Sequence, residues 1–203
     1  MALGVRLFGT RPYDEVQIGD IADAAGIAKG LLYHYFGDKR GLYLEVVRAA
    51  SAELLQTLVH DPGLTGPENL RRGLSAYLGF VEARAEAYLA LMRGGLQRDV
   101  EVERIIESVR LRIIERLAHG LGLKKLAPAF RTAARAFVGG VEAAALDWLE
   151  HKDMTMEALV DLLAAGLFGQ LVVASSQSPG SGANIDLGSG FRLLGGMFGA
   201  SKP

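Results

Sequence analysis

The amino-acid sequence predicts an all-α protein in which a small N-terminal helical domain is joined by a long helix to a larger C-terminal helical domain. Apolar residues recur at helical spacing in almost every long segment of the 203-residue chain. No segment shows the sustained alternation of apolar and polar residues that indicates strands, and Pro and Gly clusters separate the periodic segments. Because 50% of the residues are hydrophobic, the chain can bury a sizeable core.

The first sixty residues predict four helices. Apolar spacing indicates a short first helix over residues 3–8 and a second helix over residues 18–25. Gly26 ends the second helix, because glycine readily adopts the left-handed backbone that a sharp turn between helices needs, and Ile27 after it is expected to fill the junction. A third helix follows and ends by Gly37. Asp38 is a suitable N-cap for a longer fourth helix, which continues until the segment HDPGLTGP interrupts it.

The remainder of the chain predicts further helices and a glycine-rich tail. Apolar periodicity places these helices at about residues 67–81, 88–92, 105–117, 128–151 and 155–176. Pro67 and Pro128 fit the first turns of their helices, where the missing N–H group of proline costs nothing. The tail, residues 177–203, does not read as a regular element; a flexible end is one interpretation and docking of its apolar residues on the body is another.

The last two predicted helices are apolar around much of their circumference and rich in small residues, which let helix axes approach closely. We therefore predict that they form a four-helix bundle with the same helices of a second chain, giving a homodimer. The alternative is a helical hairpin that is buried inside one chain. The small residues are Gly139, Gly140, Ala143, Ala144, Ala145, Ala164, Ala165, Gly166 and Gly169.

The predicted second and third helices have the layout of a helix-turn-helix, whose second helix enters the major groove of DNA. If Leu32 and Phe36 point into the core, the other side chains of that helix point outward. Lys29 then supplies charge, Gly30 permits close approach, and the neighbouring rings supply polar tips for a phosphate backbone. The alternative is that these rings, Tyr33, His34 and Tyr35, only pack two short helices together.

The segment IGDIADAAGIAKGLLYHYFGDKRGLYLEVV resembles the DNA-binding segment of the tetracycline-repressor (TetR) family of transcriptional regulators, and LFGTRPYDEV before it is similar to that family's first helix and loop. The resemblance covers about the first 48 residues. It implies a homodimer that represses from a pseudo-palindromic DNA operator and is released by a small-molecule effector. The DNA-binding residues that it implies are Gln17, Lys29, Gly30, Leu31, Tyr33, His34, Tyr35 and Lys39.

Several of these positions differ from the family pattern. Gln17 stands where a threonine is frequent and retains a donor for phosphate, whereas Gly19 stands where an arginine is frequent. Ala28 replaces the usual serine cap. Leu31 replaces a small residue, so it would present an apolar group, suited to a thymine methyl, to the base edge. We expect operator preference to differ from that of relatives at these positions.

The resemblance and the periodicity together divide the chain into a DNA-binding domain (1–48), a ligand-binding and dimerisation domain (49–176) and the tail (177–203). The effector site is expected between the helix that begins at Pro67 and Trp148, where aromatic and methionine side chains offer an apolar lining. Each of them also fits a plain core position. The candidates are Tyr77, Phe80, Tyr88, Met92, Phe130, Phe137 and Trp148.

Other classes of protein are disfavoured by the sequence. It has no Glu-x-x-His pair, Gly-x-Ser-x-Gly elbow, P-loop or dinucleotide fingerprint, so we predict neither an enzyme nor a cofactor site. It has no cysteine and only four scattered histidines, so no metal site is predicted. A helical enzyme and a ligand-binding protein whose helix-turn-helix has lost DNA affinity remain the alternatives.

Charge and hydropathy bound the remaining expectations. The net charge of -1 excludes a protein that is basic all over, and the segment from Lys29 to Arg40 carries only a small basic excess. No run of about 18 uninterrupted apolar residues and no secretory signal occurs, so we expect no membrane association and a cytoplasmic location.

Overall fold

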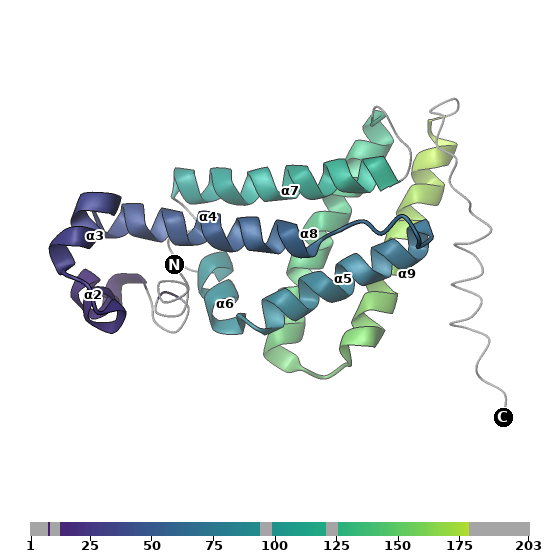
Figure 1. Ribbon diagram of the computed structural model, residues 1–203. Coiled ribbons are helices and arrows are strands. Elements are labelled where there is room, and N and C mark those ends of the chain that lie inside the picture. The colour runs from purple at the N-terminus through teal and green to yellow at the C-terminus, as the bar shows by residue number, and fades with distance from the viewer. Residues whose placement is uncertain (1–7, 9–12, 94–98, 121–125, 179–203) are drawn as a thin grey trace. The chain divides into compact units, whose positions relative to one another are not determined.

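The computed structural model describes residue 8 and residues 13–93, 99–120 and 126–178, and every regular element in these ranges is helical (Figure 1). The all-α prediction is therefore confirmed. A 3-10 helix, η1, spans Tyr13–Glu15. The α-helices that follow it are α2 (Ile18–Ala25), α3 (Lys29–Phe36), α4 (Lys39–Thr57), α5 (Gly66–Glu82), α6 (Ala85–Arg93), α7 (Val100–Gly120), α8 (Pro128–His151) and α9 (Met156–Ser176).

The helices form two compact units. The first comprises residues 1–57 and 79–109, and the second comprises residues 58–78 and 110–203. Helices α5 and α7 each contribute residues to both units, because the division falls within them. The DNA-binding segment predicted from the sequence lies in the first unit, and the two helices predicted to dimerise, α8 and α9, lie in the second.

The N-terminal elements follow the sequence prediction with two differences. Of the predicted first helix, only Phe8 lies within the described residues, where it is helical and buried. The segment after it, predicted as a loop, contains the 3-10 helix η1. Helix α4 ends at Thr57, whose hydroxyl donates to the backbone oxygen of Leu54 over 2.7 Å, before the Pro/Gly segment is reached.

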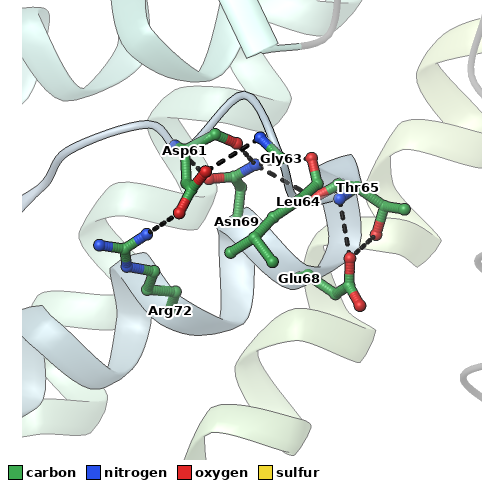
Figure 2. A network of polar contacts seen from close by, with 7 residues as sticks. All are labelled: Asp61, Gly63, Leu64, Thr65, Glu68, Asn69 and Arg72. Atoms are coloured by element: carbon green, nitrogen blue, oxygen red, sulfur yellow. Dashed lines mark hydrogen bonds and ion pairs between the residues drawn. The ribbon is translucent and has the colours of Figure 1, made fainter.

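A network of polar contacts fixes the loop between α4 and α5 within the second unit (Figure 2). The side-chain amide of Asn69, on α5, donates to the backbone oxygens of Asp61 and Leu64 over 2.9 and 3.0 Å, and its oxygen accepts from the Asp61 N–H. Arg72 donates to the Asp61 carboxylate over 2.8 Å. Thr65 and Glu68 form a capping pair at the start of α5, as Figure 2 shows.

Helices α8 and α9 pack together as a hairpin within the second unit. Thr155 caps α9, because its hydroxyl accepts from the Ala158 N–H over 3.2 Å. Lys152 ends α8 with a φ of 51°, a left-handed conformation that glycine usually provides, and its ammonium lies 3.4 Å from the ring centroid of Trp148. The Trp148 indole donates to the backbone oxygen of Met154 over 2.9 Å, which ties the end of α8 to the loop that follows.

Charged pairs connect α8 and α9 to the rest of the second unit. Arg110 on α7 makes a bidentate pair with Glu142 on α8, with N···O distances between 2.7 and 3.1 Å. Arg71 on α5 pairs with Asp161 on α9. Both pairs are partly shielded from solvent, so removing one partner leaves a poorly solvated charge behind.

Candidate DNA-binding surface

Helices α2 and α3 form the predicted helix-turn-helix. Gly26 ends α2 with a φ of 65°, and the Ile27 N–H donates to the Ala22 oxygen over 3.1 Å, which closes the turn. Ile18, Ile21 and Ala22 on α2 and Leu32 on α3 are buried, as the apolar spacing predicted. One expectation is wrong: Ile27 is 38% exposed and does not fill the junction between the two helices.

Helix α3 exposes almost every side chain except Leu32. Phe36 is half-buried, in keeping with its predicted anchoring role. Leu31 and Tyr35 are 43% and 71% exposed, so an apolar group and a ring are presented to solvent. The predicted DNA-binding residues of α3 that are exposed are Lys29, Gly30, Leu31, Tyr33, His34 and Tyr35.

The exposed rings of α3 are organised by contacts along the helix. The Lys29 ammonium lies 5.9 Å from the centroid of the Tyr33 ring. The His34 and Tyr35 rings pack edge to face with centroids 5.4 Å apart. These contacts restrict the rings, which stay exposed to solvent.

Gln17 precedes α2 in an extended conformation, and its side chain is exposed and makes no cap hydrogen bond. Its amide is therefore available at the helix N-terminus, where backbone N–H groups also favour an anion. Ala28 at the corresponding position of α3 has no side-chain acceptor. Gly19 is open on its side-chain face, with nothing within 4 Å of an added Cβ.

Lys39, the first residue of α4, is engaged with an aromatic cluster rather than projecting alone. Its ammonium lies 4.3 Å from the centroid of the Tyr13 ring. Tyr13 packs edge to face on Tyr43 at 5.3 Å, and Tyr43 packs on Phe8 at 5.1 Å. Burial raises the pKa of Tyr43 to about 12, so this ring stays neutral and structural. The cluster holds a cationic side chain at the α4 N-terminus.

The structure adds one contact at this surface that the sequence did not indicate. Arg40, counted in the sequence as part of a basic segment, makes a bidentate pair with Asp99, which directly precedes α7. The two residues are 59 positions apart, and no local pattern connects them. Pairing reduces the basic excess that the segment presents to a polyanion.

The predicted effector-site residues divide between the two units. Tyr77, Phe137 and Trp148 lie in the second unit and are buried, as Phe130 is. Phe80, Tyr88 and Met92 lie in the first unit. The contacts of two of them are structural: Trp148 is hydrogen-bonded to Met154, and the ring of Phe80 packs on the Arg84 guanidinium at 4.1 Å. Neither unit by itself brings the whole predicted set together.

Within the described residues, no group of three His, Asp or Glu side chains is placed to hold a metal ion. The histidines lie on separate elements: His34 is exposed on α3, and His151 Nδ1 donates to the Asp147 backbone oxygen over 2.9 Å near the end of α8. This contact at the end of α8 gives His151 a structural role.

The fold and the exposed α3 define a helix-turn-helix DNA-binding regulator. The chain belongs to the TetR family: residues 1–46 match the family of bacterial regulatory proteins, tetR family, and residues 67–169 match the tetracyclin repressor-like C-terminal domain. Regulators of this family are DNA-binding proteins without enzymatic activity, so the prediction of a non-enzymatic transcriptional regulator is confirmed.

Individual proteins that are similar to this chain support the same family assignment. A tetR-family transcriptional regulator from Streptomyces coelicolor is 27% identical in sequence and has a TM-score of 0.82, covering 95% of this chain and 85% of that one. An uncharacterized HTH-type transcriptional regulator of Mycobacterium tuberculosis is 26% identical over 155 residues, and this chain spans 65% of its length. The HTH-type transcriptional activator FasR of Mycolicibacterium smegmatis is 26% identical over 176 residues, covering 79% of this chain and 78% of that one.

Proposed function

We propose that this protein is a homodimeric repressor that leaves a pseudo-palindromic DNA operator when a small-molecule effector binds. The observation that carries the proposal is α3, an eight-residue helix anchored through Leu32 and exposed on most of its other positions. A helix that presents a cation, polar-tipped rings and an open glycine has the chemistry of a recognition helix in a major groove. We assign residues 1–48 to this DNA-binding role.

Within this proposal, the side chains fall into two groups. Gln17, Lys29 and Lys39 contact phosphates and set the register on the duplex. Leu31 lies nearer the base edges, where an apolar group favours a thymine methyl. The polar tips of Tyr33 and His34 face phosphates. Gly30 permits close approach, because nothing lies within 4 Å of an added Cβ. Tyr35 joins the first group through its exposed hydroxyl.

Dimerisation through α8 and α9 is supported by exposed faces of small and apolar residues. On α9, Leu162 and Val173 are 59% and 56% exposed and lie on the same face as Gly166 and Gly169. The exposed face of α8 comprises Thr132, Ala136, Gly139, Gly140 and Ala143. A Cβ added at any of these four glycines meets nothing within 4 Å inside the chain. Small residues on an exposed helix face let a second helix approach closely, so these positions suit contact with a second chain.

Helix α9 is long and apolar enough to cross a membrane by length and composition. We propose that its exposed apolar face packs against the second chain, in a cytoplasmic protein.

Regulation by an effector follows from linkage. An effector that binds better to the DNA-free dimer weakens DNA binding by the same factor by which DNA weakens effector binding. We keep residues 49–176 as the effector-binding and dimerisation domain. Among the candidate effector contacts, Tyr77 and Phe137 are buried in the second unit, and Phe80, Tyr88 and Met92 lie in the first. Trp148 is the least suited of the candidates to contact an effector, because its indole N–H already donates to the Met154 backbone oxygen.

Selection from a pool of random duplexes tests the DNA-binding proposal. The wild-type protein is expected to enrich a sequence with two inverted half-sites at low salt, because each copy of α3 reads one half-site. The Tyr33→Ala/His34→Ala variant is the matched control: both side chains are exposed, so it should fold normally and enrich nothing. A wild-type protein that enriches no duplex at low salt would exclude the DNA-binding role.

Activation is the second candidate for the direction of regulation, because the FasR relative is named an activator. A reporter gene placed downstream of the enriched duplex separates the two. A repressor lowers reporter expression when the protein is present, and an activator raises it. The Tyr33→Ala/His34→Ala variant should leave expression unchanged in both cases.

A further inference from the structure

Arg40 and Asp99 form a charged pair in the first unit in which both carboxylate oxygens are used. The Arg40 Nε and Nη2 atoms lie 2.6 and 2.8 Å from the two carboxylate oxygens of Asp99. This fork geometry uses both oxygens, fixes the plane of the guanidinium and is stronger than a single ionic contact. The Asp99 side chain is only 13% exposed, whereas that of Arg40 is 48% exposed.

Asp99 is held in place by α7 as well as by Arg40. Its Oδ1 accepts from the Glu101 N–H over 2.9 Å, so the carboxylate caps the N-terminus of α7. The guanidinium and the backbone N–H groups together lower the pKa of Asp99 to about 2. Arg40 is therefore joined to an acceptor that does not move independently of α7.

Arg40 lies where a displacement of α4 would displace α3. Gly37, with a φ of 76°, and Asp38 are the only residues between the two helices. The Asp38 carboxylate accepts from the Gly41 N–H over 2.7 Å, which fixes the first turn of α4. Helix α3, of which only Leu32 is buried, packs on both α2 and α4, so its position depends on α4 as well as on α2.

We propose that Arg40 is a positioning residue for DNA binding, which acts through Asp99 and does not contact the DNA. This inference rests on the proposed function. The pair fixes the first turn of α4, and with it α3, against the N-terminus of α7. The rival role for an arginine beside Lys39 is a phosphate contact. That role would require Arg40 to leave Asp99, and a mostly buried carboxylate would lose its strongest partner.

The Asp99→Asn variant distinguishes the two roles by the sign of its effect. Asparagine still caps a helix, so α7 keeps its N-cap, but the charged fork is lost. Removing an acidic charge near DNA raises affinity if electrostatics alone decide. Positioning predicts the opposite: about tenfold weaker binding to the duplex that wild type enriches, and a smaller ratio of its affinity to that for a scrambled duplex.

Arg40→Lys provides the second arm, measured on the same two duplexes by fluorescence anisotropy at several salt concentrations. Lysine keeps the charge but not the fork, so positioning predicts a loss like that of Asp99→Asn, with an unchanged salt slope. The double variant should be no weaker than either single variant. Arg48→Ala is the control. It removes a charge from α4 that pairs with Glu45 on the same helix, and it should bind like wild type.

The outcomes are separable. Asp99→Asn binding as tightly as wild type or tighter, or Arg40→Lys retaining wild-type binding, overturns the positioning role while leaving the proposed function intact. Failure of the wild type to enrich any duplex overturns both. Far-ultraviolet circular dichroism and urea unfolding of each variant check that it is folded. The unfolding free energies of wild type and Asp99→Asn should also converge as pH falls toward 2, where the Asp99 carboxylate takes up a proton.

Discussion

At the scale of single residues, the candidate DNA surface separates side chains that hold helices from side chains that face outward. Leu32 is buried while its neighbours Leu31 and Tyr33 are exposed. One face of α3 therefore anchors the helix, and the other exposes side chains that are available for DNA contacts. Lys39 combines the two roles, because its ammonium lies over the Tyr13 ring at the start of α4. A cation held in this way loses less side-chain entropy when it meets a phosphate.

We expect Lys39→Ala to reduce the slope of log affinity against log salt concentration by about one unit, because one phosphate contact and its released counterion are lost. Tyr33→Ala should weaken binding to all duplexes while changing the slope only slightly, since a phenol carries no charge. Titrations of one duplex at several salt concentrations measure both. Equal slopes for wild type and Lys39→Ala would contradict the phosphate role of Lys39.

Much of the residue-level surface could be predicted from the sequence, because exposure along α3 follows from helical geometry once Leu32 is assigned to the core. The partner of Arg40 could not be predicted in this way. Asp99 is distant from Arg40 in sequence, and only the tertiary fold places this residue, which caps α7, beside α4. The exposure of Ile27 was also missed, since an apolar residue after a turn glycine was assumed to fill the junction.

At the scale of elements, helix boundaries were predictable where the sequence carries a start or stop signal. Gly26 ends α2, Pro128 begins α8 and Thr155 caps the start of α9, each where the sequence predicted a boundary. The end of α8 is different, because Lys152 adopts the left-handed conformation without being glycine. The ring of Trp148 beneath its ammonium favours this arrangement, and such a contact is invisible in a one-dimensional pattern.

The glycines on the exposed face of α9 lead to a prediction about dimerisation. Gly166→Ala/Gly169→Ala should weaken dimerisation at least about tenfold, because added methyl groups separate the helices of the two chains. Unfolding of the single chain should not become easier, since alanine favours helix and meets no neighbour within the chain. Analytical ultracentrifugation over a dilution series measures the dimer, and urea unfolding measures the chain.

A pair of glycines on α5 provides the control. Gly73 and Gly79 are also helical, and an added Cβ at either meets nothing within 4 Å. The Gly73→Ala/Gly79→Ala variant should therefore dimerise like wild type. An equal dimer dissociation constant for both double variants and wild type would argue against α9 as the interface.

At the scale of the whole molecule, the proposed homodimer places two identical recognition helices on one duplex. A two-fold dimer requires inverted half-sites about one helical turn apart, roughly 34–36 Å. The affinity of the dimer therefore depends on spacing as strongly as on sequence, because a misplaced second α3 loses all its contacts together.

We expect insertion of about five base pairs between the half-sites of the enriched duplex to weaken binding by about a hundredfold or more, since the half-sites then face opposite sides of the DNA. A duplex carrying one half-site is the control and should bind about as weakly as the spaced duplex. Gel mobility shifts with both duplexes measure the effect. Unchanged affinity after the insertion would indicate that each chain binds DNA independently.

The contact between Trp148 and Lys152 has a spectroscopic consequence. Trp148 is the only tryptophan in the sequence, and it is 4% exposed in the last turn of α8. A positive charge 3.4 Å from the ring and a carbonyl that accepts from the indole N–H both perturb its excited state. The intrinsic fluorescence of the native protein therefore reports on one known place, the closed end of the α8–α9 hairpin, without any introduced label.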